Sequence, residues 1–153
     1  MNYIKKIAFL CLAILFMSCA LQNEAKPKIN QGIYGNVRWL AGNQMPSPDE
    51  PRNSGATVQR KISIYEVTSF KQAIGMAPLF TEIKTKLVKT IISNKKGYYE
   101  ASLAPGFYSI FTQEPEGGYF ANTFNGEGQI AVVEVKKGEV FRFDININYK
   151  AAY

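Results

Sequence analysis

Residues 97–111 (GYYEASLAPGFYSIF) constrain the fold of this chain more than any other stretch. Before its centre, every second residue is apolar or aromatic, as in a strand with one buried face; these residues are Tyr99, Ala101 and Leu103. Pro105-Gly106 ends that strand, because proline has no amide hydrogen and glycine accepts the positive φ that many turns need. The alternation resumes at Tyr108 and Ile110, which predicts a hairpin around a corner. We expect Tyr108 to return its hydroxyl to the corner backbone, as in the tyrosine corner of β-sandwiches.

Other segments show the same period of two and are separated by turn residues. They are residues 32–40, 57–67, 79–93 and 140–149. Residues 130–135 have apolar residues on both faces, as in a strand buried between layers. Gly35 predicts a bulge or a close backbone approach within the first of them. Residues 79–93 change face between Leu87 and Val88, which predicts either a bulge or two consecutive strands. Residues 68–78 predict a short helical turn outside the sheets. About seven strands predict an all-β, antiparallel, seven-stranded β-sandwich.

The same residues carry a family resemblance. The pattern Gly-x-Tyr-x-Ala-x-Leu-x-Pro-Gly-x-Tyr over residues 97–108, preceded by Gly35-x-Val37, resembles the carboxypeptidase regulatory-like domains. The resemblance covers roughly residues 32–149. It implies a transthyretin-like, Ig-like sandwich of the kind common in bacterial envelope proteins, and it implies no peptidase activity.

The N-terminus predicts a targeting segment. Lys5 and Lys6 precede an apolar run over residues 7–17 that is too short to span a membrane comfortably. The run ends at Ser18-Cys19, which resembles the lipobox of bacterial lipoproteins. We therefore expect a signal peptide over residues 1–18 and lipidation of Cys19, with the membrane as a partner through that lipid. The alternative is an ordinary secretory signal with an incidental cysteine, but no A-x-A site follows Cys19.

Cleavage before Cys19 leaves a polar, flexible tether over residues 19–31 and one domain over residues 32–153. The signal contains two of the 18 basic residues, so 16 face 12 acidic ones and the net charge is about +4. These charges are scattered, which argues against nucleic-acid binding. The resemblance to the lipobox and to domains common in envelope proteins implies a location in the cell envelope, at the outer membrane.

The chain contains no histidine, so it lacks the commonest general base and the commonest metal ligand. With Cys19 committed to lipid, we expect no metal site, no cofactor and no enzymatic activity. Two acidic pairs, Asp49-Glu50 and Glu114 with Glu116, are interpreted as solvated loop charges. We assign no catalytic residue.

A glycine-rich loop over residues 114–128 is the one candidate for binding. Aromatic rings and asparagines supply contact area and adaptable hydrogen bonds at low entropic cost. The candidate binding residues are Tyr119, Asn122, Phe124 and Asn125. The alternative is that the rings plug the end of the sandwich. We expect Phe120 to point inward, and we expect Trp39 to belong to the core.

The predicted function is therefore that of a non-catalytic cell-envelope lipoprotein whose β-sandwich presents loops to a protein or glycan. A structural spacer in an envelope assembly is the first alternative. A histidine-free hydrolase is the second.

Overall fold

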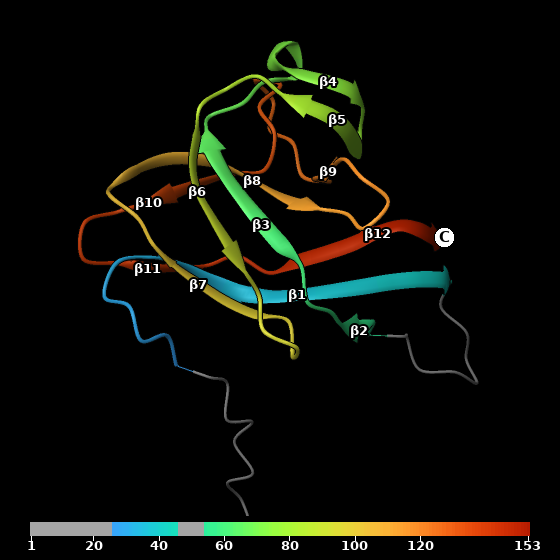
Figure 1. The fold of residues 1–153 in the computed structure, drawn as a ribbon, viewed down its shortest axis with the longest axis horizontal. Coiled ribbons are helices and arrows are strands. Elements are labelled where there is room, and N and C mark those ends of the chain that lie inside the picture. Colours follow the sequence, from blue (N-terminus) through green and yellow to red (C-terminus); the bar gives the residue numbers. More distant parts are fainter. Residues whose placement is uncertain (1–25, 46–53) are drawn as a thin grey trace, which may run out of the picture.

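A computed structural model describes residues 26–45 and 54–153, and these residues form a sandwich of two β-sheets (Figure 1). The first sheet has five strands: β1 (Gly32–Asn43), β2 (Ala56–Thr57), β7 (Tyr98–Ser102), β11 (Val140–Arg142) and β12 (Ile145–Ala152). The second has seven: β3 (Lys61–Glu66), β4 (Ala73–Met76), β5 (Leu79–Ile83), β6 (Leu87–Ile92), β8 (Gly106–Gln113), β9 (Tyr119–Phe120) and β10 (Val132–Val135). The 3-10 turn η1 (Phe70–Gln72) precedes β4. The predicted all-β sandwich is confirmed.

Strand β1 lies at the centre of the first sheet. Along one edge it pairs antiparallel with β7 and then with β2. Along the other edge it pairs parallel with β11 and then with β12. These parallel pairings, and the larger number of strands, correct the expectation of seven antiparallel strands. The alternation of side chains reports which face is buried but not the direction of the neighbouring strand, so it could not reveal the parallel pairs.

The corner at Pro105-Gly106 connects the two sheets, and the expected hairpin is wrong. Strand β7 pairs with β1, whereas β8 pairs with β3, β9 and β10. The inward side chains of β7 and β8 contribute to the same core from opposite sides, so the two strands face each other across it. The predicted tyrosine corner is confirmed, because the Tyr108 hydroxyl donates to the Ala104 carbonyl at 3.0 Å.

The strand expected over residues 140–149 is interrupted at Phe143-Asp144. Here the chain passes so close to β1 that a Cβ on Gly35 would lie 2.2 Å from the Phe143 carbonyl oxygen. The Phe143 amide donates to the Tyr34 carbonyl at 2.8 Å. The buried Tyr99 hydroxyl donates to the Phe143 carbonyl. The close approach predicted at Gly35 is confirmed, and it separates β11 from β12.

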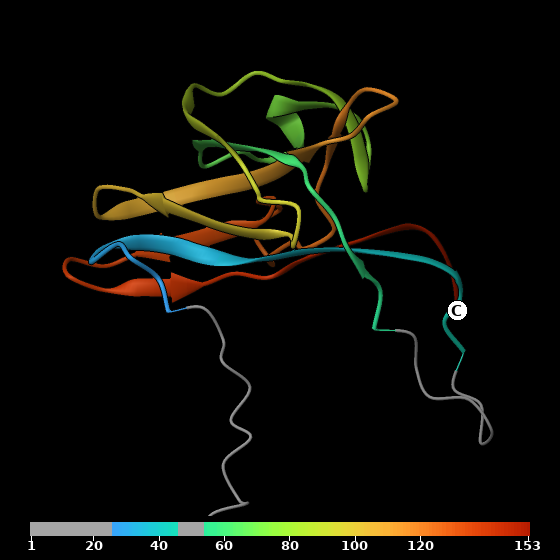
Figure 2. The same ribbon diagram turned by 60° about the horizontal axis from the view of Figure 1, so that its bottom comes forward.

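Two apolar clusters stabilise the sandwich. The first fills the space between the sheets and includes Ile33, Val37, Ile62, Ile64, Ile110, Phe120 and Ile147. The second includes Tyr65, Phe80, Phe111, Ala121 and Ile130. Tyr65 and Phe111 alternate with residues of the first cluster, so they lie on the opposite face of the second sheet. Figure 2 shows η1, β4 and β5 lying over that face.

Residues 79–93 form two strands that are separated at residues 84–86, and the predicted change of face between Leu87 and Val88 is a bulge within β6. Strand β5 pairs with β4 and β9, whereas β6 pairs with β3. The helical turn expected over residues 68–78 is present only as η1, because β4 follows it at once. The signal segment, Cys19 and most of the tether lie outside the described residues. At the end of the tether, Gln31 Nε2 donates to the Leu103 carbonyl at 2.7 Å.

Gly35→Ala should destabilise the protein by about 1–3 kcal/mol, because the added methyl group overlaps the Phe143 carbonyl and must push the chain away from β1. The measurement is the midpoint of denaturant unfolding. Gly126→Ala is the matched control, since a Cβ there meets no atom within 4 Å. Equal midpoints for the two variants would contradict this account of the approach.

Candidate functional site

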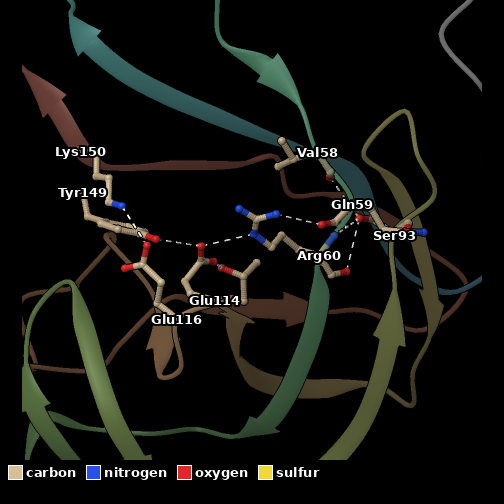
Figure 3. A network of polar contacts seen from close by, with 9 residues as sticks. Val58, Gln59, Arg60, Ser93, Glu114, Glu116, Tyr149 and Lys150 are labelled. Carbon is tan, nitrogen blue, oxygen red and sulfur yellow. Dashed lines mark hydrogen bonds and ion pairs between the residues drawn. The ribbon is translucent and has the colours of Figure 1, made fainter.

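A buried polar cluster lies at one end of the sandwich, where the two sheets meet (Figure 3). We call the residues Arg60, Thr112, Glu114 and Tyr149 the inter-sheet cluster. Arg60, Thr112 and Glu114 lie in or beside strands of the second sheet, and Tyr149 lies in β12 of the first. The Glu114 side chain is 1% exposed, although Glu114 follows the end of β8 in a loop.

Both carboxylate oxygens of Glu114 accept hydrogen bonds. Arg60 Nε donates to Oε2 at 3.3 Å, and the Tyr149 hydroxyl donates to the same oxygen at 3.2 Å. Thr112 Oγ1 donates to Oε1 at 3.0 Å. A buried carboxylate is stable only when it is paired and hydrogen-bonded, and these three donors meet that requirement.

Aromatic rings surround the charged groups of the inter-sheet cluster. The Arg60 guanidinium lies 5.8 Å from the centroid of the Trp39 ring, which suits a cation–π contact. Trp39 contacts Tyr149 edge to face, with ring centroids 5.0 Å apart. Burial raises the pKa of Tyr149, and the negative charge of Glu114 raises it further. The hydroxyl of Tyr149 is therefore held in its protonated, donating form.

The expectation that Glu114 and Glu116 are both solvated loop charges is wrong for Glu114. Glu116 does face solvent, with a side chain that is 76% exposed and paired to Lys150 at 3.1 Å. Glu114 turns inward because Arg60 and Tyr149 provide donors there. These partners are 54 and 35 residues away along the chain, so no local spacing could have identified them. Trp39 packs against the first core cluster, as expected.

Arg60→Ala should cost about 2–4 kcal/mol of stability, because it leaves the Glu114 carboxylate buried without its cation. Lys150→Ala is the matched control. It removes the exposed partner of Glu116 and should cost about 1 kcal/mol or less. Chemical denaturation of both variants at neutral pH measures the difference. A cost for Arg60→Ala no greater than that for Lys150→Ala would show that Arg60 does not stabilise the buried Glu114 carboxylate.

Tyr119 and Phe120 form the short strand β9, between β5 and β8. Phe120 is 1% exposed and belongs to the first core cluster, as predicted. Tyr119 is half-buried against the second cluster, with its ring centroid 6.0 Å from that of Tyr65. Burial raises the pKa of Tyr65, and the neighbouring Tyr119 hydroxyl adds to that rise. Tyr119 therefore packs on the sandwich, and its role in binding stays a prediction.

The two candidate asparagines hold the loop in place. Asn122 Nδ2 donates to the Asn146 carbonyl at 3.1 Å and to Asn148 Oδ1 at 3.0 Å, which ties the loop to β12. Asn125 Oδ1 accepts from the backbone amides of Glu127 and Gln129 at 3.1 and 2.9 Å, an Asx-type turn. Asn122 therefore contacts β12, whereas Asn125 stabilises a turn within the loop. A role in ligand binding stays a prediction for each.

Phe124 contacts Phe70, a residue that the sequence did not identify as part of a site. Its ring centroid lies 5.0 Å from that of Phe70 in η1, and the two side chains are 43% and 44% exposed. We call these residues the phenylalanine pair. Backbone hydrogen bonds join their segments, since the Phe70 amide donates to the Gly128 carbonyl at 3.0 Å. Phe70 fitted the helical turn expected at residues 68–78, and no local pattern connected that turn to residue 124.

No family model, curated protein or solved structure matches this chain. Within residues 26–45 and 54–153, no helix is long and apolar enough to cross a membrane. The same residues contain no group of three or more acidic or cysteine side chains placed to hold a metal ion.

Proposed function

We propose that this protein is a non-catalytic, lipid-anchored envelope protein whose sandwich presents the phenylalanine pair to a protein or glycan. The observation that carries the proposal is the contact between Phe70 and Phe124, two rings that are both exposed and joined across separate loops. Exposed aromatic rings grouped on rigid loops are typical of binding surfaces.

The loops beneath the phenylalanine pair support its use in binding. The Asx-type turn at Asn125 and the backbone bonds between residues 68–70 and 128–130 hold both rings before any partner arrives. A surface ordered in advance loses less conformational entropy when it binds. Amide groups of Asn125 and Gln129 lie in the same turn and hydrogen-bond each other at 2.7 Å. They are adaptable partners for hydroxyl or peptide groups.

The non-catalytic part of the proposal rests on the residues available. The chain has no histidine, and the buried carboxylate of Glu114 accepts hydrogen bonds from three donors. A carboxylate paired with Arg60 and 1% exposed is stabilised in its ionised form inside the protein. The inter-sheet cluster therefore suits a structural role, and we assign it that role.

The anchor part of the proposal makes a separate prediction. Cys19→Ala should release the protein from membranes or leave it uncleaved, because two or three acyl chains each contribute about 0.8 kcal/mol per buried methylene. Fractionation with mass determination of the N-terminus distinguishes these outcomes. A Cys19→Ala protein that has lost residues 1–18 and still sediments with membranes would exclude the lipid as the anchor.

The binding part is tested with Phe124→Ala and with the double variant that adds Phe70→Ala. Full-length protein in detergent is immobilised and exposed to solubilised envelope proteins and, separately, to envelope glycans. The parent should retain a specific component, and the double variant should retain less than about a tenth of it, as expected for central aromatic contacts. Phe107→Ala is the matched control, because Phe107 is 58% exposed on β8 and lies outside the phenylalanine pair.

Equal retention by the parent and the double variant would exclude the phenylalanine pair as the binding surface. Retention of nothing by the parent would favour the spacer role instead. Melting temperatures of all variants establish that each remains folded.

A further inference from the structure

Strand β6 (Leu87–Ile92) forms an edge of the second sheet. It pairs with β3 along one side, and no strand among the described residues pairs with its other side (Figure 1). An edge of this kind offers unpaired amide and carbonyl groups to a further strand. The side chains of β6 determine whether such an addition is favoured or prevented.

The hydrogen-bond pattern shows which backbone groups face outward. The Ser93 amide donates to the Arg60 carbonyl at 2.9 Å, so this pair of residues is hydrogen-bonded. Bonded and non-bonded pairs alternate along an antiparallel ladder. Thr90 and Ile92 belong to the non-bonded pairs, and their amides and carbonyls therefore point away from β3. Beyond a bulge in the ladder, the bond from the Glu66 amide to the Lys86 carbonyl gives Leu87 the same orientation.

Strand β6 exposes apolar side chains to solvent at both of its ends. The side chains of Leu87 and Ile92 are 49% and 67% exposed, and they lie on the sheet face opposite the core. Exposed apolar residues on an unpaired edge strand are unusual, because they promote pairing with other chains. One lysine of the strand, Lys89, is directed toward the other sheet, where its Nζ donates to the Ser102 carbonyl at 3.0 Å.

Positive charge flanks β6 on both sides. Between Lys84 and Gly97 the chain has five lysines and no acidic residue. Lys84 and Lys86 precede β6, and Lys95 and Lys96 follow it. Lys61 of β3 adds a further positive charge, because it is the partner of Ile92. Glu66 of β3 lies opposite Lys86, to which its amide is hydrogen-bonded, and it is an acidic residue at that end of the β3–β6 ladder.

We propose that β6 is a docking edge for an extended segment of another polypeptide with an apolar centre and acidic residues at both ends. The segment adds to the second sheet as a further strand. Its backbone pairs with the outward groups of Thr90 and Ile92, its apolar side chains lie beside Leu87 and Ile92, and its carboxylates meet the flanking lysines. This proposal is independent of the phenylalanine pair.

Self-pairing and simple edge protection both fit this strand less well. A second copy of this chain pairing β6 against β6 would bring the flanking lysines together, and the repulsion would oppose dimerisation. Lysines and bulges can also serve only to prevent edge pairing, and β6 has both, in Lys89 and in the bulge at Val88. The Lys89 amino group is bonded to the other sheet, however, so the edge exposes Leu87, Thr90 and Ile92, and the remaining lysines lie before and after β6.

The test uses full-length protein in detergent and labelled peptides read by fluorescence anisotropy. The probe has alternating valine and threonine over the length of β6 and glutamates at both ends. A second peptide replaces the glutamates with lysines, and a third keeps them but is N-methylated at alternate amides. We expect only the glutamate peptide with free amides to bind, and we expect its affinity to fall at least about tenfold on raising salt from about 0.05 M to 0.5 M.

Thr90→Pro removes an amide that points away from β3, so the sandwich is retained while the edge is blocked. It should weaken the glutamate peptide at least about tenfold, whereas Thr90→Ala should stay within about twofold of the parent. Lys86→Glu should weaken it at least about fivefold, and Lys137→Glu, in the turn before β11, should have no comparable effect. If Thr90→Pro does not fold, the comparison of Lys86→Glu with Lys137→Glu tests the proposal.

Equal binding of the N-methylated peptide would overturn strand addition. So would equal binding of the lysine peptide. If the parent instead binds vesicles of phosphatidylglycerol and Thr90→Pro binds them equally well, the edge recognises charge alone and a membrane surface is its partner.

Discussion

The close approach of Phe143 to β1 is the contact on which the rest of the sandwich depends. Because Gly35 has no side chain, the Phe143 carbonyl reaches the sheet, where it accepts a hydrogen bond from the buried hydroxyl of Tyr99. The Asn36 amide then donates to Asp144 Oδ1 at 2.8 Å. These contacts lie where β11 ends and β12 begins, between two strands that both pair parallel with β1. One small residue thus determines the register of the last strands against the first.

The inter-sheet cluster is the second contact that connects distant parts of the sandwich. Glu114 receives donors from both sheets, so separating the sheets there would remove the Tyr149 hydrogen bond from a buried carboxylate. With the core and the ends stabilised in this way, the loops and one edge are left to make other contacts. The phenylalanine pair and the β6 edge lie on different parts of the second sheet, and their chemistry differs: one is aromatic, the other is apolar with positive ends.

Much of the architecture was predictable from sequence, because it depends on local patterns. The alternation of Tyr99, Ala101 and Leu103 identified a buried face, and all three side chains are buried in the first core cluster. Pro105-Gly106 identified the corner, and Tyr108 completed it as expected. Gly35 indicated a close backbone approach, although it did not identify Phe143 as the partner. In each case the information lies within a few residues, where backbone geometry and side-chain period act directly.

Tertiary structure alone decided which of these local elements meet. It placed β7 and β8 in different sheets, made the partners of β1 parallel, and brought Glu114 to Arg60 and Tyr149. It also joined Phe70 to Phe124 across 54 residues of chain. An alternation of apolar residues indicates which side chains are buried, but not which residues cover them. Pairing partners and ion pairs depend on contacts between distant segments, and the free energy that selects them comes from burying the whole core at once.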